Sequence, residues 1–318
     1  MKCVIFGGAG FIGSHIADAL VASGHDVRVF DHPNIDTRNL TNILSHIEVV
    51  SGDFFNENDL APVLSGAEIV IHLVSSTIPS SSNKNPVYDV QTNLIGTLRM
   101  LDLARETGIR KIVFASSGGT VYGQPTVSPI PETHPTEPLC SYGITKLAIE
   151  KYLQLYQNLY GLEYVVLRIS NPYGERQNPL GGLGAVTTFL ARVADGKPVT
   201  IWGDGTVRRD YFYVDDLANA FVRAIEQSPP SRVFNIGSGS SLSLNELLSA
   251  MRSVTGKNPE VIYTPGRKLD VHVSCLDIQR AQVELGWTPQ TSLHEGLTKT
   301  WAWLTRETPT NSHGWHGA

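Results

Sequence analysis

A tyrosine and a lysine four residues apart, Tyr142 and Lys146, are the side chains of this sequence best suited to acid–base chemistry. On a helix the two positions share one face. A phenol with its ordinary pKa of about 10 is a poor base near neutral pH, and an adjacent ammonium lowers that pKa because it stabilises the phenolate. The spacing therefore predicts a tyrosine that exchanges a proton with a substrate, against the alternative of an exposed pair without function.

A glycine-rich segment near the start of the sequence has the spacing of a phosphate-binding loop. Gly7, Gly10 and Gly13 follow a predicted strand and open a predicted helix, where side chains would keep the backbone away from a pyrophosphate. Asp31 ends the second predicted strand, 18 residues beyond Gly13, and a carboxylate there can accept hydrogen bonds from ribose hydroxyls. Because a carboxylate repels a 2′-phosphate, we expect NAD rather than NADP.

Bound NAD carries a positive nicotinamide, which would add to the effect of Lys146 on the pKa of Tyr142. Asp53 follows the third predicted strand and is expected beside the adenine. Each assignment has a structural alternative. The glycines can form a plain turn, Asp31 can be a turn residue, and Asp53 can cap the helix predicted at Leu60.

Short runs rich in Val, Ile and Phe alternate with helical patterns over the first two-thirds of the chain. Such nearly continuous apolar runs are typical of strands buried on both faces of a parallel sheet. The expected strands are 4–6, 27–30, 48–50, 69–73, 112–115 and 164–169, and the expected helices are 14–23, 60–64, 88–107 and 142–160. This alternation predicts an α/β fold with a Rossmann-like, doubly wound parallel sheet.

After about residue 171 the alternation ends. Helices are expected at 185–194, 216–227, 244–255 and 293–304, and a strand at 199–202. We therefore expect an NAD-binding domain in residues 1–170 and a smaller, mixed α/β substrate domain mainly in residues 171–318, with one or two returns of the chain and a flexible tail at 308–318. The smaller domain should cover the carboxyl ends of the strands, where open α/β sheets bind ligands.

The composition excludes several classes of protein. The net charge is −5, from 25 basic and 30 acidic residues, and no basic block interrupts the balance, which argues against nucleic-acid binding. Three scattered cysteines and ten histidines show no metal-binding spacing, and no apolar run approaches the about 18 residues that span a bilayer. With no signal peptide recognisable, we expect a cytoplasmic protein without metal or membrane partner.

Three motifs together resemble those of the extended short-chain dehydrogenase/reductase family, in its branch of NAD-dependent nucleotide-sugar epimerases. They are the glycine spacing, the segment Ser116-Ser117-Gly118-Gly119-Thr120-Val121-Tyr122-Gly123, and the Tyr142–Lys146 pair. The resemblance covers nearly the whole chain. It implies bound NAD, a UDP-sugar substrate, and a homodimer formed through a four-helix bundle from the outer faces of helices 88–107 and 142–160.

The resemblance assigns catalysis to Ser117, Tyr142 and Lys146. Many relatives have one residue fewer between the catalytic Ser or Thr and the Val-Tyr-Gly that follows. When the catalytic position is counted forward from the predicted strand, it falls on Ser117. When it is counted back from Val121, it falls on Gly118, which has no side chain. We choose Ser117 and keep Ser116 as the alternative; both can also be plain strand-end serines.

The resemblance also assigns binding residues. The cofactor would contact Gly7, Gly10, Phe11, Ile12, Gly13, Asp31, His32, Asp53, Phe54, Leu73, Val74, Ser75, Thr77, Asn93, Tyr142 and Lys146. The nucleotide sugar would contact Ser117, Asn171, Trp202, Arg209, Arg267, Asp270 and Ser274. Among these, Trp202 can equally be a core residue, Arg267 and Asp270 a surface ion pair, and Ser274 a plain continuation of the strand at 271–273.

The implied reaction is epimerisation at C4 of a UDP-hexose, a UDP-N-acetylhexosamine or its uronic acid through a 4-keto intermediate. Tyr142 would take the 4-hydroxyl proton while NAD accepts the hydride, and Ser274 would leave room for an N-acetyl group. A dehydratase or decarboxylase would need an acid beside Ser117, where Gly118 and Gly119 stand. A reductase and a non-catalytic NAD-binding regulator remain alternatives.

Overall fold

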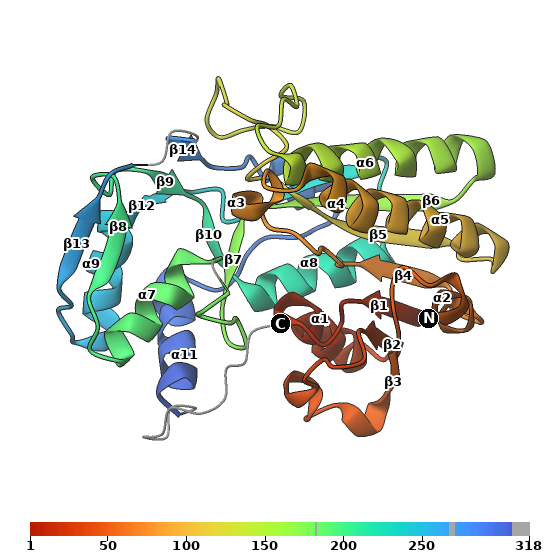
Figure 1. The fold of residues 1–318 in the computed structure, drawn as a ribbon, viewed down its shortest axis with the longest axis horizontal. Coiled ribbons are helices and arrows are strands. Elements are labelled where there is room, and N and C mark those ends of the chain that lie inside the picture. Colours follow the sequence, from red (N-terminus) through yellow and green to blue (C-terminus); the bar gives the residue numbers. More distant parts are fainter. Residues whose placement is uncertain (182, 267–270, 307–318) are drawn as a thin grey trace.

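The protein is built around one parallel β-sheet, as the computed structural model in Figure 1 shows for residues 1–181, 183–266 and 271–306. Its seven strands lie in the order β11-β6-β5-β4-β1-β2-β3 and all neighbours are parallel. The strands are β1 (Lys2–Phe6), β2 (Asp26–Asp31), β3 (Ile47–Ser51), β4 (Ile69–His72), β5 (Lys111–Ser117), β6 (Glu163–Ile169) and β11 (Val233–Ile236). The order reverses between β1 and β4, which confirms the predicted doubly wound sheet and marks the place where such sheets bind ligands.

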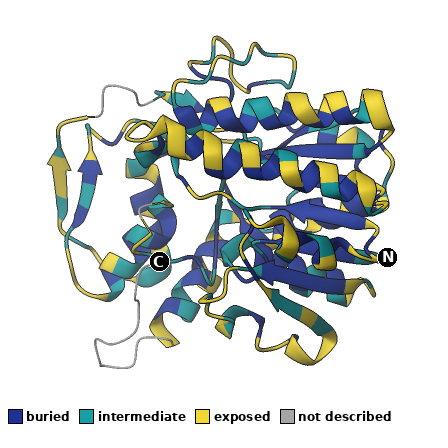
Figure 2. Cartoon of the chain, turned by 45° about the vertical axis from the view of Figure 1, so that its right-hand side comes forward, coloured by how far each residue is buried: buried dark blue, intermediate teal, exposed yellow. Residues whose placement is uncertain are grey.

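Helices cover both faces of this sheet. On one face α1 (Phe11–Ala22) packs beside α8 (Val214–Glu226), and α10 (Gln279–Glu284) extends the layer. On the other face lie α2 (Glu57–Leu64), α5 (Gly96–Glu106) and α6 (Ser141–Tyr160). Alternate residues of each strand enter the two cores: Ile5 faces the α1 side and Phe6 the α6 side. Figure 2 shows the buried strands between helices whose outer faces are exposed.

The segment expected as one helix at 88–107 is interrupted. It contains α4 (Pro86–Asp89), a wider π-helical stretch at Val90–Ile95 and then α5; the short α3 (Pro79–Ser82) precedes it, and 3₁₀ turns occur at Arg38–Leu40 and Leu44–His46. π-Helical turns insert a residue into the helical register and occur frequently at functional sites. Here the turn contains the buried side chains of Thr92 and Asn93.

A smaller part of the protein lies over the carboxyl ends of the strands. It contains α7 (Ala185–Ala194), α9 (Leu244–Thr255) and α11 (Leu293–Arg306) around a separate apolar core. Its short strands pair as β7 (Asn171–Tyr173) with β10 (Tyr211–Tyr213), β8 (Val199–Trp202) with β13 (Val261–Thr264), and β9 (Arg208–Arg209) with β12 (Leu242–Ser243) and β14 (Val273–Ser274).

The chain passes between the two parts repeatedly. It leaves the sheet after β6, returns for α8 and β11, leaves again for α9 and β13, and returns for α10. The tail at 308–318 lies outside the described residues. Within the described ranges, no helix is long and apolar enough to cross a membrane.

Candidate active site

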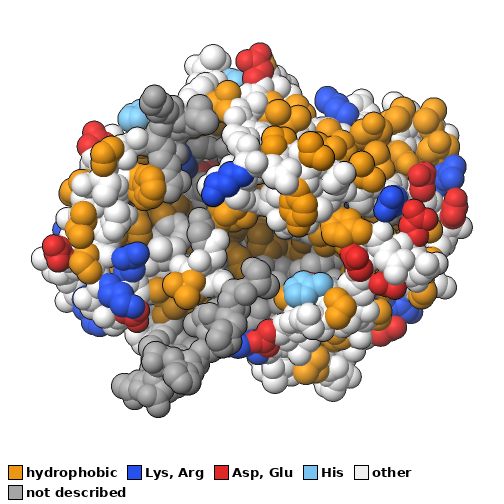
Figure 3. Space-filling view, in the orientation of Figure 1, with side chains coloured by type: hydrophobic (Ala, Val, Ile, Leu, Met, Phe, Trp, Pro, Cys, Tyr) orange, Lys and Arg blue, Asp and Glu red, His pale blue; other side chains and the backbone are white. Residues whose placement is uncertain are grey.

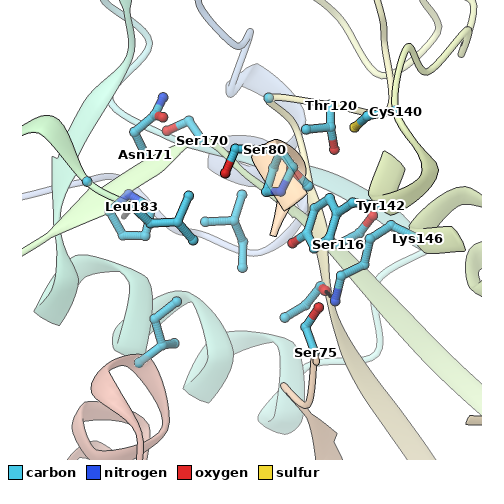
Figure 4. Close-up of a pocket in the computed structure, with 18 of the residues that line it drawn as sticks. Ser75, Ser80, Ser116, Thr120, Cys140, Tyr142, Lys146, Ser170, Asn171 and Leu183 are labelled. Atoms are coloured by element: carbon cyan, nitrogen blue, oxygen red, sulfur yellow. Dashed lines mark hydrogen bonds between the residues drawn. The ribbon is translucent and has the colours of Figure 1, made fainter. Parts of the chain in front are cut away.

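A cavity of about 1080 Å³ opens between the carboxyl ends of the strands and the smaller part of the protein. It is the hollow at the centre of Figure 3. Thirteen of the predicted site residues line it: Gly7, Gly10, Phe11, Ile12, Gly13, Leu73, Ser75, Ser117, Tyr142, Lys146, Asn171, Trp202 and Arg209. Figure 4 shows Ser75, Ser116, Tyr142 and Lys146 on one side of this space and Asn171 and Leu183 on the other.

The glycine loop is too tightly packed for side chains at its key position. A Cβ on Gly13 would lie 2.2 Å from the carbonyl oxygen of Gly7, and Gly7 itself has a positive φ of 84°. The loop leads directly into the N-terminus of α1, whose free backbone N–H groups favour a phosphate. The cradle therefore fits the pyrophosphate of a dinucleotide.

Asp31 closes this cradle at the end of β2. Its carboxylate accepts hydrogen bonds from the backbone N–H of Ala9, at 3.1 Å, and of His32, at 3.0 Å. Burial raises the pKa of Asp31, and these two hydrogen bonds oppose the effect. The acid is thus held against the glycine loop, where a ribose attached to the pyrophosphate would lie.

Seven expected cofactor residues contribute no atoms to the described lining of the cavity: Asp31, His32, Asp53, Phe54, Val74, Thr77 and Asn93. Asp53 accepts a hydrogen bond from the N–H of Phe55, at 2.9 Å, in a local turn. The ring of Phe54 packs in the core against Phe6 and His72.

Lys146 lies deep in the site. Its Nζ donates a hydrogen bond of 2.9 Å to the carbonyl oxygen of Ala115 and stands 5.6 Å from the centre of the Tyr142 ring. Burial lowers the pKa of Lys146 to about 8, and the negative charges of Asp89 and Glu150 oppose that shift. The ammonium therefore titrates close to the physiological range.

The pKa of Tyr142 differs from our expectation. Burial raises it, and the charges of Cys140 and Asp89 act in the same direction. The expected lowering by the neighbouring ammonium does not prevail in the protein alone, because desolvation of the phenolate is the larger effect. A positive charge bound beside the ring would oppose this rise.

The two serines at the end of β5 have different partners. The hydroxyl of Ser116 donates a hydrogen bond of 2.5 Å to Glu150. Ser117 faces the cavity, and its hydroxyl makes no hydrogen bond within the described residues. Gly118 has no room for a side chain, since a Cβ there would lie 2.5 Å from Leu276. Ser116 also lines the cavity, but its hydroxyl is bonded to Glu150, whereas no such partner binds the hydroxyl of Ser117 within the described residues.

The substrate side of the cavity is formed by the smaller part. The Nδ2 of Asn171 donates to the carbonyl oxygen of Asp210, at 3.0 Å, and the guanidinium of Arg209 donates to that of Val271, at 2.6 Å. Trp202 lies at the end of β8 and is 47% exposed, so it is not a core residue. Arg267 and Asp270 lie outside the described residues.

Ser274 is placed differently from our expectation of a sugar-facing residue. It is 5% exposed, pairs with Arg209 across β14 and β9, and does not contribute to the described lining. Val271, three residues earlier, does line the cavity.

Several lining residues were not expected from the sequence. They include Pro79, Ser80, Asn83, Thr120, Cys140, Ser170, Gln177, Leu183 and Gly184. Asn83 also accepts a hydrogen bond of 2.8 Å from the N–H of Ser141, at the start of α6. These residues come from loops and from the short helix α3, whose approach to the site depends on tertiary packing. Only the polar run at 75–83 offered a signal in the sequence.

Residues 3–237 match the model of the NAD dependent epimerase/dehydratase family. The chain belongs to this family. Over 303 residues it is 41% identical to a putative UDP-glucose 4-epimerase of Methanocaldococcus jannaschii, covering 95% of this chain and 97% of that protein. It is 38% identical to the UDP-glucose 4-epimerase of Mycolicibacterium smegmatis over 94% of this chain and 97% of that protein.

Solved structures of the family agree with the fold. The UDP-glucose 4-epimerase of Thermotoga maritima with UDP-glucose has a TM-score of 0.91 and 38% identity, over 96% of this chain and 99% of that one. A UDP-N-acetylglucosamine 4-epimerase of Methanobrevibacter ruminantium has a TM-score of 0.91 and 28% identity. The match covers 96% of this chain and 99% of that one. Family membership makes NAD the cofactor that the glycine cradle and Asp31 are suited to bind.

Proposed function

We propose that this protein is an NAD-dependent epimerase that inverts C4 of a UDP-sugar. The observation that carries the proposal is one cavity bounded by Ser117, Tyr142 and Lys146 on the sheet side and by Asn171 and Arg209 on the other. A proton-transfer group thus faces residues able to bind a nucleotide diphosphate. UDP-glucose 4-epimerases among the similar proteins support the same reaction.

NAD, when bound, supplies the reversible oxidation of the sugar carbon. The residues of the chain do the remaining work. Tyr142 accepts the proton of the 4-hydroxyl and later returns it, and Ser117 donates a hydrogen bond to the same oxygen. Lys146 binds the nicotinamide ribose and, as an ammonium, stabilises the phenolate of Tyr142.

Two other reactions of the family deserve comparison. The chain is 32% identical to UDP-glucuronic acid decarboxylase 1 of Danio rerio and to a dTDP-4-dehydro-6-deoxyglucose reductase of Escherichia coli. Elimination or decarboxylation chemistry would use an acid close to Ser117. Gly118 and Gly119 follow it, and the described lining of the cavity contains no Asp or Glu. Epimerisation needs no such group.

The test is to incubate the purified protein and NAD with UDP-glucose, UDP-N-acetylglucosamine and UDP-glucuronic acid in turn, and to resolve the C4 epimers by chromatography and NMR. We expect an equilibrium mixture of epimers without net formation of NADH. Stoichiometric consumption of added NADH would indicate a reductase, release of carbon dioxide a decarboxylase, and binding of NAD without any turnover a regulator.

The range of sugars is part of the proposal. We infer that UDP-N-acetylhexosamines or their uronic acids are used at least as well as plain UDP-hexoses. The structural similarity to a UDP-N-acetylglucosamine 4-epimerase supports this range. Because Ser274 is buried, the space for an acetyl group must be provided by residues that do line the cavity, such as Val271 and Leu183.

We further infer a homodimer in the cytoplasm. An exposed apolar stripe runs along α6 through Ile144, Tyr152, Leu155 and Leu159, and it falls in the apolar area at the upper right of Figure 3. Exposed Val87, Tyr88, Val90 and Ile95 from the preceding helical segment add to it. A large exposed apolar surface is typical of a protein interface. The three free cysteines agree with a reducing compartment.

A further inference from the structure

Asp89, at the end of α4, is a carboxylate with no exposure to solvent and four hydrogen-bond donors. One oxygen accepts from the hydroxyl of Thr77 and from Nδ2 of Asn93, the latter at 2.8 Å. The other accepts from Ser141, at 2.6 Å, and from Thr145, at 2.8 Å. These hydrogen bonds outweigh burial and hold the pKa of Asp89 below its ordinary value, so the group is ionised at neutral pH.

The donors tie Asp89 to both members of the catalytic pair. Ser141 immediately precedes Tyr142, and Thr145 immediately precedes Lys146. One carboxylate oxygen therefore fixes the first turn of α6 at two points, Ser141 and Thr145. The residue that follows each point, Tyr142 or Lys146, lines the cavity. Two hydroxyls bonded to one oxygen allow this turn little rotation or translation.

The other oxygen of Asp89 holds the segment that follows β4. Asn93, which it orients, accepts a hydrogen bond of 2.9 Å from the N–H of Ser76 and donates one of 3.2 Å to Thr77. The adjoining Ser75 lines the cavity. Asp89 thus connects the segment after β4 with the start of α6, across the place where Tyr142 and Lys146 lie.

Asp89 also differs from the other acid near Lys146. Glu150 forms an ion pair of 2.7 Å with Arg168, which balances its charge. All four donors to Asp89 are neutral hydroxyl or amide groups. The remaining ionisable neighbours include His72, whose pKa burial lowers to about 3 so that it is neutral, and Tyr142, whose pKa burial raises so that it is neutral as well. Asp89 is therefore the unbalanced negative charge that acts on Lys146.

We propose that Asp89 is a positioning residue of the reaction, which fixes Tyr142 and Lys146 on α6 and whose negative charge keeps Lys146 in its ammonium form. The inference rests on the proposed function, because turnover is its first readout. It assigns a role to a residue that touches neither the cavity nor a substrate.

The test compares Asp89→Asn with the wild-type enzyme over a range of pH. The amide keeps the shape of the side chain and removes its charge. Lys146 then loses its proton more easily, so the alkaline limb of kcat should move to lower pH by about one unit, and kcat at pH 7 should fall by about twofold from this effect. A profile with the wild-type alkaline limb would overturn the electrostatic role, whatever the change in stability.

Asp216→Asn is the matched control. Asp216 is 3% exposed and accepts hydrogen bonds from the backbone N–H groups of Gln290 and Thr291, at 2.9 and 3.0 Å, away from the cavity. The Asp216→Asn protein should be less stable than the wild type, but the alkaline limb of its kcat profile should not shift. An equal shift in this control would show that general loosening of the fold, and not the charge of Asp89, moves the profile.

A second measurement does not depend on turnover. Asp89→Asn leaves the buried ammonium of Lys146 without its balancing charge, and Lys146→Met removes that ammonium. Thermal unfolding of the single and double variants should therefore show that Asp89→Asn destabilises the Lys146→Met protein less than the wild type. Equal destabilisation would refute the charge link even if no UDP-sugar is converted, whereas an inactive wild type refutes only the proposed function.

Discussion

The hydroxyl of Ser116 donates a hydrogen bond of 2.5 Å to Oε1 of Glu150, in the buried layer beneath the site. Glu150 in turn binds the guanidinium of Arg168, whose Nη1 donates to the hydroxyl of Tyr122 at 3.0 Å. Ser116 is therefore engaged in a structural network, while the adjacent Ser117 remains available to the cavity.

This difference predicts opposite effects of two alanine substitutions. Ser117→Ala should lower kcat by about a hundredfold, as expected when a group is lost that assists proton transfer. Ser116→Ala should lower the free energy of unfolding by about 2 kcal/mol, because a hydrogen bond to a charged group is lost, with a smaller effect on kcat. Kinetics and chemical denaturation of both variants check this. The reverse pattern would make Ser116 the catalytic serine.

Tyr142→Phe should retain the fold and bind NAD but lose turnover by about a hundredfold or more, because the proton acceptor is removed and the ring is kept. Turnover is measured with the best UDP-sugar of the panel, and NAD binding by calorimetry. Activity close to that of the wild type would exclude Tyr142 as the base.

Asp31→Ala should narrow the preference for NAD over NADP by about tenfold, an effect of about 1.4 kcal/mol. Removing the carboxylate removes the repulsion of a 2′-phosphate. Because Asp31 also accepts the N–H of Ala9, affinity for NAD itself should fall. Dissociation constants of both cofactors for wild type and variant decide the matter, and tighter binding of NADP by the wild type would contradict the assignment.

The acid stability of the protein should depend on Asp89. Its pKa in the folded protein lies below the ordinary 3.8, so its contribution to stability is fully present above that value and is lost as the pH falls through the lower folded pKa. The Asp89→Asn protein should therefore have a lower free energy of unfolding at neutral pH than the wild type. As the pH falls, its free energy of unfolding should decrease less steeply than that of the wild type. Denaturation curves between neutral pH and pH 2 measure the difference, and parallel declines of the two proteins would argue against an ionised Asp89.

Charge on the α6 stripe should weaken the dimer. Leu159→Glu places a carboxylate on a side chain that is 60% exposed, and Val283→Glu on α10, where Val283 is 77% exposed, is the matched control outside the stripe. Analytical ultracentrifugation should find the first variant monomeric and the control dimeric. A wild type that is monomeric at micromolar concentration would contradict the proposed interface.

The parts of the site that the sequence predicted are local. The glycine spacing, Asp31 at a strand end and Tyr142 with Lys146 on one helix each depend on a few neighbouring residues, and all but Asp31 line the cavity. The parallel sheet followed in the same way from apolar runs, although the edge strand β11 was missed because it lies after a long excursion of the chain.

The features that were missed depend on contacts between distant segments. Asp89 contacts Ser141, 52 positions away in the sequence, and no local pattern marks that pairing. Likewise, Ser274 is buried where β14 pairs with β9 and does not contribute to the described lining of the cavity. The raised pKa of Tyr142 reflects burial that the Tyr–Lys spacing does not report.

The repeated passage of the chain between its two parts has a consequence for truncation. Residues 1–170 lack α8 and β11, which bring Leu217, Phe221, Phe234 and Ile236 into the core on the α1 side of the sheet. A fragment ending at 170 would expose that face of the sheet to water and leave β6 as a bare edge, which favours aggregation. The nucleotide-binding part is therefore expected to fold only within the intact polypeptide. It should not be expressed in stable form without the part that closes over it.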